Sequence, residues 1–93
     1  MSRAEAKRIA LSIEREIKES PWEKIREIAD QVTERSVTGV DGKEYPVRID
    51  AEPEEFEEER GYRFFVSVDS EGFLGGISPV SRHFFLAYPV EGP

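Results

Sequence analysis

The feature that most constrains the fold of this chain is the alternation of side chains over residues 62–69. A repeat of two residues is typical of a strand with one buried face, and aromatic and β-branched residues favour strands. We therefore expect a sheet built around this strand, with its apolar face covered by the part of the chain that precedes it. The apolar set is Tyr62, Phe64, Val66 and Val68, and the alternating set is Arg63, Phe65, Ser67 and Asp69.

A first amphipathic helix is predicted over residues 3–19. Ser2 followed by Glu5 forms a capping box, in which each side chain bonds a free amide at the helix start. Apolar residues then recur every three or four positions, which places them on one stripe that we expect to face the core. The stripe contains Ala6, Ile9, Ala10, Ile13 and Ile17.

A second helix is predicted to begin directly after the first and to reach about residue 34. Ser20 is a suitable N-cap, Pro21 suits the first helical position, and Glu23 completes a second capping box. Its apolar stripe is expected to include Val32. We expect Trp22 to anchor this helix start in the core rather than to line a binding pocket, because it can bury a large apolar area.

Strands are expected in the rest of the chain. Asp41-Gly42 predicts a type I′ turn in a β-hairpin over residues 36–50. Pro46, which has no amide hydrogen, predicts an edge position or a bulge, so we expect this hairpin at a sheet edge. Further strands are predicted over residues 73–78, where Gly75-Gly76 indicates a bend or bulge, and over residues 82–88.

The predicted fold is therefore α+β in a single domain of 93 residues. An N-terminal helical hairpin over residues 1–35 packs on one face of an antiparallel β-meander of about four strands. The β-hairpin over residues 36–50 is followed by an acidic connecting segment over residues 51–60 and antiparallel strands over residues 61–90.

The net charge of −7 is confined to the second part of the chain. Residues 1–35 hold eight basic and eight acidic side chains, whereas residues 36–93 hold five basic and twelve acidic ones. An acidic surface repels phosphate, which argues against direct nucleic-acid binding, and it attracts basic proteins. The alternative interpretation is that the acidity only keeps a small protein soluble.

The candidate binding residues fall in two groups. Six of the eight residues at positions 52–59 are glutamates, and this segment is either a docking site for a basic partner or a solvated loop. It lacks the ligand spacing and turn glycine of a calcium loop, so no metal is expected. Neighbouring phenylalanines in a strand point to opposite faces, so one from each pair should form an apolar strip on the uncovered face. The candidates are Glu52, Glu54, Glu55, Phe56, Glu57, Glu58, Glu59, Phe65 and Phe85.

No motif for catalysis is found in the sequence. There is no cysteine, His83 is the single histidine, and no Gly-x-Ser-x-Gly motif occurs. We therefore expect no enzyme activity and no cofactor. The favoured function is a small acidic protein-interaction module of the immunity, antitoxin or inhibitor type, which binds a basic partner. One alternative is a self-associating domain that dimerises through the apolar strip. The other is a small-molecule or enzymatic site between the helices and the sheet, with His83, Tyr45 or Tyr62 as polar contacts.

Composition also bears on the environment of the protein. No apolar run approaches the length of a membrane span, and the first residues have neither the pattern of a secretory signal nor that of a transit peptide, so a cytoplasmic location is expected. With 35% charged residues and neither Asn nor Cys, the composition is typical of thermostable proteins, and also of designed sequences.

Overall fold

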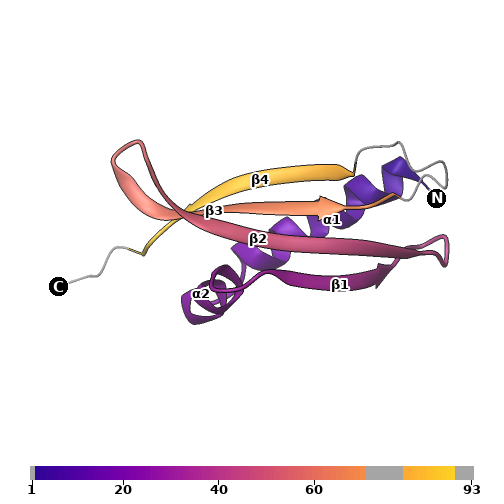
Figure 1. Cartoon of the computed structure of the whole chain (residues 1–93), viewed down its shortest axis with the longest axis horizontal. Helices are drawn as coiled ribbons and strands as arrows, with labels where there is room; N and C mark the ends of the chain where they lie inside the picture. Colours follow the sequence, from indigo (N-terminus) through magenta and orange to yellow (C-terminus); the bar gives the residue numbers. More distant parts are fainter. Residues whose placement is uncertain (1, 71–78, 90–93) are drawn as a thin grey trace.

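A computed structural model describes residues 2–70 and 79–89 of the chain and confirms the α+β class. The sheet has the order β1-β2-β3-β4, and every neighbouring pair is antiparallel, as in a meander (Figure 1). The predicted strand over residues 73–78, with Gly75-Gly76, lies outside the described residues. The elements are α1 (Arg3–Lys18), α2 (Trp22–Ala29), β1 (Thr33–Thr38), β2 (Glu44–Phe56), β3 (Glu59–Val68) and β4 (Val80–Ala87).

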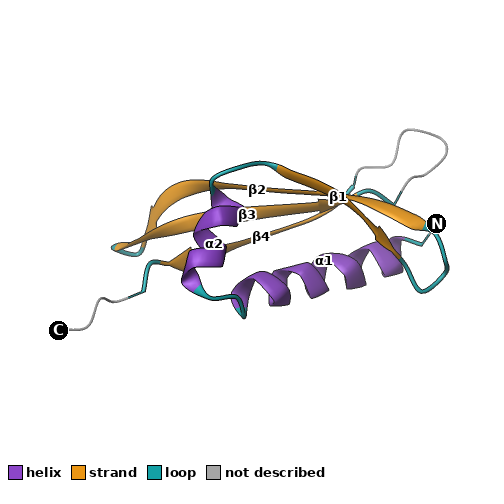
Figure 2. Cartoon of the chain, turned by 90° about the horizontal axis from the view of Figure 1, so that it is seen from below, coloured by secondary structure: helices purple, strands orange, loops and turns teal. Residues whose placement is uncertain are grey.

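Helix α1 lies along one face of the sheet, against β3 and β4 (Figure 2). Its predicted cap is confirmed, since the Ser2 hydroxyl oxygen accepts a hydrogen bond of 3.1 Å from the amide of Glu5. Its predicted apolar stripe is buried throughout. Glu14 is also buried, and it accepts bonds from Lys18 on the same helix and from Arg82 on β4, which ties the helix to the far edge of the sheet.

Helix α2 is shorter than predicted, because it ends at Ala29. The prediction that Ser20 caps this helix is wrong: its hydroxyl donates to the carbonyl of Glu16 at the end of α1 instead, at 2.7 Å. Val32 is 52% exposed rather than part of a buried stripe, because β1 begins one residue later and pairs with β2. The two helices also cross steeply rather than running back along each other, and α2 lies beside β2 (Figures 1 and 2).

The turn between β1 and β2 is not the predicted type I′ turn. Among its residues only Gly42 has a positive φ, of 78°. The amide of Gly42 donates to the carbonyl of Gly39 at 3.0 Å, and the amide of Gly39 donates to the carbonyl of Lys43 at 2.8 Å. These bonds describe a type I turn closed by a left-handed glycine, which is the usual three-residue hairpin loop.

The acidic segment over residues 51–60 is not a connection, which corrects the sequence prediction. It forms the far end of a long hairpin in which β2 pairs with β3 from Val47 to Phe56. Glu57 and Glu58 make the two-residue turn, and their φ values of 51° and 67° are those of a type I′ turn. Pairing with the strongly β-prone strand β3 therefore overrides the low strand propensity of glutamate and proline.

The edge position predicted from Pro46 is wrong for its own strand, because β2 is an inner strand where β1 accompanies it, although β1 itself forms an edge of the described sheet. Strand β2 also contains Pro53. The amide of Asp69 donates to the carbonyl of Pro46, so the backbone of Pro46 faces the position just after the last residue of β3. Alternation places the nitrogen of Pro53 on the opposite side of β2, where β1 has already ended at its Thr33–Ile49 pair. Each proline therefore occupies a position where no ladder amide is required.

The core lies between α1, α2 and the inner face of the sheet. Gly61 is needed for the close contact between β3 and β4, because a Cβ built there would lie 2.0 Å from the carbonyl oxygen of Leu86 and 2.7 Å from the Cα of Ala87. Strands β3 and β4 therefore approach each other more closely at this point than any side chain allows. The buried apolar residues are Ala6, Ile9, Ala10, Ile13, Ile17, Ile25, Tyr45, Val47, Ile49, Phe64, Val66, Val68, Val80 and Phe84.

Candidate functional site

The face of the sheet opposite α1 carries the predicted apolar strip. Phe64 and Phe84 stack in the core with ring centroids 5.5 Å apart, so their neighbours Phe65 and Phe85 point to the other face. Phe65 is 38% exposed. Phe56, which the sequence could not place, lies on this outer face as well, with its ring centroid 5.5 Å from that of Phe85. The outer face thus holds three phenylalanines, one each on β2, β3 and β4.

Arg63 is the centre of the outer face. Its Nε and Nη2 atoms donate to the same carboxylate oxygen of Glu54, at 3.0 and 2.7 Å. Its guanidinium lies over the rings of Phe56 and Phe85, with distances of 5.3 and 5.6 Å to the ring centroids. The Arg63 side chain is only 17% exposed, so these contacts are shielded from water more than ordinary surface contacts.

His83 joins this group from β4. Its Nδ1 lies 3.5 Å from Nη1 of Arg63, and its ring centroid is 6.2 Å from that of Phe65. His83 is exposed and lies beside an arginine rather than a hydroxyl or a carboxylate, so it has no arrangement that would activate a nucleophile. We call Glu54, Phe56, Arg63, His83 and Phe85 the Arg63 cluster.

The register shows which of the predicted binding residues share a surface. Glu52, Glu54 and Phe56 alternate along β2 on the outer face, opposite Arg63, Gly61 and Glu59 of β3. Glu57 and Glu58 form the turn. Glu55 lies opposite Arg60, and by alternation this pair belongs to the inner face of the sheet. The structure therefore places Glu52, Glu54, Phe56, Glu59, Phe65 and Phe85 on the outer face. The remaining glutamates surround its end.

Arg63 is the residue that sequence reasoning missed. Its position between Tyr62 and Phe64 already places it on the same face as Phe65. The outward phenylalanines predict an apolar strip on that face, and this pattern does not indicate an arginine at its centre. The useful signal was the excess of glutamates at positions 52–59, because a buried arginine requires a carboxylate partner nearby.

The three residues of the predicted small-molecule site lie in three different places. His83 is on the outer face, and Tyr45 is fully buried below the β1–β2 turn. Tyr62 is half-buried at the other end of the inner face, where it stacks with Trp22 at a centroid distance of 6.0 Å. A hollow of about 350 Å³ next to this stack is lined by Trp22, Arg26, Tyr62, Tyr88 and Pro89. Trp22 packs against the core, as predicted, but it is only half-buried and also lines this hollow, which the prediction did not include.

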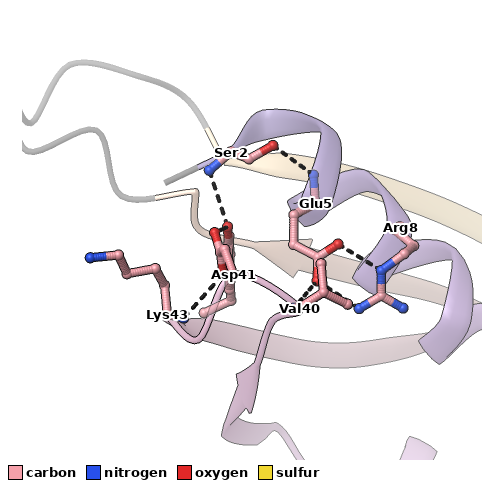
Figure 3. Close-up of polar contacts among 7 residues, drawn as sticks. Ser2, Glu5, Arg8, Val40, Asp41 and Lys43 are labelled. Carbon is pink, nitrogen blue, oxygen red and sulfur yellow. Dashed lines mark hydrogen bonds and ion pairs between the residues drawn. The ribbon is translucent and has the colours of Figure 1, made fainter.

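A second polar group joins the start of α1 to the β1–β2 turn (Figure 3). The Glu5 carboxylate accepts two bonds from Arg8, at 2.6 and 2.7 Å, and one bond of 2.6 Å from the amide of Val40. These bonds lower the pKa of Glu5, chiefly through Arg8, and raise that of Arg8. Every strong donor and acceptor in this group has a partner within the chain, so we assign it to stability rather than to binding.

Tyr45 completes this second polar group. Its buried hydroxyl donates to Asp41 at 2.7 Å and accepts a bond of 3.0 Å from the amide of Ser2. Burial raises the pKa of Tyr45, and Asp41 raises it further, while the same hydrogen bond lowers the pKa of Asp41. The hydroxyl therefore stays protonated and holds the turn against the start of α1.

Within residues 2–70 and 79–89, no group of three or more histidine or carboxylate side chains is arranged to hold a metal ion. No helix in this part of the chain has the length and apolar character required to cross a bilayer. Comparison of the chain with models of protein families, with curated proteins and with solved structures finds no match.

Proposed function

We propose that this protein is a small, non-enzymatic interaction module that binds a basic protein partner, in the manner of an immunity protein, antitoxin or inhibitor. The observation that carries the proposal is the outer face, where exposed aromatic rings lie among carboxylates. Exposed aromatic side chains supply contact area, and surrounding charges of one sign select the partner and speed the encounter.

The charges of the outer face support a basic partner. By alternation this face carries six carboxylates and two guanidinium groups, and the glutamates of the β2–β3 turn extend the acidic surface beyond it. Two copies packed face to face would bring like charges together, which is unfavourable. The acidic residues of the outer face are Glu34, Glu44, Asp50, Glu52, Glu54 and Glu59, and the basic ones are Arg48 and Arg63.

The test is selection of peptides from a random 12-residue library displayed on phage, with the folded protein as the target. We expect the selected peptides to carry Lys or Arg among apolar residues, and to bind at least tenfold more weakly at 0.5 M than at 0.05 M salt, where screening is strong. Selection of peptides without basic residues, or binding that does not depend on salt, would contradict the proposal.

The matched variants change the same charge at two places. The first variant is a triple substitution to Gln of Glu52, Glu57 and Glu58, and it should weaken binding of the selected peptides. Glu19, Glu23 and Glu27, which are exposed on or beside the helices, replaced by Gln should leave it unchanged. Glu54 is left in place in both variants, because it holds Arg63. Equal loss of binding in the two variants would show that only net charge matters.

Edge-to-edge self-association through β4 is a second candidate function, and one observation favours it. No strand among the described residues lies beyond β4, so the amides of Ser81, His83 and Phe85 face away from β3. Such an edge can pair with a second copy. Light scattering across a concentration series tests it, and Phe85→Glu should reduce the mass of a dimer to that of a monomer. A single monomeric mass at every concentration would rule it out.

A further inference from the structure

The environment of Arg63 shows what the outer face offers to a guanidinium group. The Arg63 cluster surrounds that group with two aromatic rings and the Glu54 carboxylate, and it leaves little of the side chain in water. The arginine comes from the chain itself, so it fills this position permanently. The side chains around Arg63 therefore show which groups hold a guanidinium on this face, and a second position on the same face can be compared with them.

The adjacent position has the same kinds of side chain without an arginine. Asp50 lies directly opposite Phe65 in the β2–β3 register, and Glu52 is the next residue of β2 on that face. Phe65 is 38% exposed, and its ring centroid lies 6.2 Å from that of His83. Residues paired across two strands have Cβ atoms about 4.5–5.5 Å apart, so a carboxylate and an aromatic ring adjoin here, as at Arg63.

The carboxylates at this second position are weakly engaged. Glu52 is exposed and forms no ion pair with the residues that the structure describes, because the guanidinium of Arg63 is turned toward Glu54. Asp50 has one contact, at 3.5 Å from Nε of Arg48, and Arg48 also reaches Glu34 at 3.1 Å. Two carboxylates and an exposed ring are therefore available to a cation from outside.

We infer that Asp50, Glu52 and Phe65 form a receptor for an arginine side chain of the partner protein, with the guanidinium stacked on Phe65 and bonded to the carboxylates. This inference rests on the proposed function and specifies the chemistry of the partner. Arginine is favoured over lysine because its planar group stacks on a ring and presents parallel N–H donors to a carboxylate, whereas an ammonium is a more strongly hydrated point charge.

The experiment is an NMR titration of the full chain with three small probes: N-acetyl-arginine N-methylamide, its lysine counterpart and its uncharged citrulline counterpart. Ring signals of Phe65 and amide signals of residues 50–52 and 63–65 report on the site. We expect saturable shifts confined to these signals, with a dissociation constant for the arginine probe at least threefold below that for lysine, and no saturation with citrulline.

Variants separate the receptor from general acidity. Glu52→Gln should weaken arginine binding at least threefold, and Phe65→Leu should remove the preference for arginine over lysine. Glu44→Gln is the matched control, because it removes the same charge from the same face at the start of β2, where Glu44 accepts bonds from Ser36 and Thr38, and it should change binding less than twofold. A thermal unfolding curve for each variant confirms that it is folded.

Three results would overturn the inference: equal affinity for arginine and lysine, shifts spread over all acidic residues, or equal effects of Glu52→Gln and Glu44→Gln. The peptide selection distinguishes this failure from failure of the proposed function. If basic peptides bind the outer face while the arginine probe does not shift Phe65, the receptor is wrong and the binding function stands. If no basic peptide is selected, the function itself is contradicted.

Discussion

The β2–β3 turn contains two glutamates in a backbone conformation that suits glycine and asparagine, and this leads to a sharp prediction. Glu57 and Glu58 have φ values of 51° and 67°. The preferred sequence for a type I′ turn is Asn-Gly. We therefore predict that the double substitution Glu57→Asn, Glu58→Gly makes the protein more stable, although it removes no unfavourable contact seen in the core.

The size of the effect follows from the backbone. The left-handed conformation costs an L-residue about 1–2 kcal/mol, so the two glutamates together cost about 2–4 kcal/mol relative to glycine. Asparagine retains part of that cost, and a glycine loses roughly 0.5–1 kcal/mol more conformational entropy on folding than other residues. The expected net gain is about 1–2 kcal/mol, which corresponds to a rise of about 5–15 °C in the unfolding midpoint of a domain this size.

The assay is thermal and urea unfolding followed by circular dichroism. Glu57→Gln, Glu58→Gln is the matched control, because it removes the same two charges and keeps two side chains in the left-handed conformation. Gly42→Ala should have the opposite sign, since it places a side chain at the positive φ of the other turn. If the Asn-Gly protein is no more stable than the Gln-Gln protein, the strain argument is wrong and only charge repulsion was relieved.

Three further predictions concern the packing and the polar contacts. Gly61→Ala should lower stability by more than about 2 kcal/mol in urea unfolding, because its Cβ would overlap the backbone of β4, and a loss below about 0.5 kcal/mol would contradict the close approach. Tyr45→Phe should lower the thermal midpoint by roughly 5–10 °C, because it leaves the Ser2 amide and Asp41 without a buried partner, and an unchanged midpoint would show that water replaces the hydroxyl. Burial raises the pKa of Glu14, but the hydrogen bonds from Lys18 and Arg82 outweigh it and lower the pKa overall. Its stabilising effect is thus present above the ordinary carboxyl pKa of about 4.3 and is lost as the pH falls through the lowered pKa. Urea midpoints measured from pH 7 to pH 2 should therefore fall in acid, and Glu14→Gln should be less stable at pH 7 and lose less on acidification; an equal loss in both proteins would exclude this ion pair as a cause.

The fold was predictable where one local signal agreed with tertiary packing. Three features are found as expected: the cap at Ser2, the buried stripe of α1 and the alternation around Phe64. The cap starts the helix at the predicted residue, and the two patterns place apolar residues on the face that the core requires. The end of α2 was not predictable, because no glycine or proline marks it. It is set by the pairing of Thr33 with Ile49, which a local pattern does not contain.

The candidate site was predictable in its residues and not in its arrangement. The sequence indicated the glutamates at positions 52–59 and the outward phenylalanines, but it suggested a loop, because Glu and Pro are rare in strands. Glutamate is not a typical residue of a type I′ turn, so the sequence at Glu57 and Glu58 did not predict the tight hairpin that brings Phe56 to Phe85. Without that hairpin, Arg63 had no visible partner.

The contact between the first helix and the last described strand has a consequence for biosynthesis. Arg82 bonds Glu14 across 68 positions of sequence, and α1 covers β3 and β4 rather than the strands that follow it directly. While the protein is being made, α1 leaves the ribosome long before its packing surface exists. The nascent chain must keep an amphipathic helix unpartnered until residues 80–87 emerge, so its core can close only late in translation.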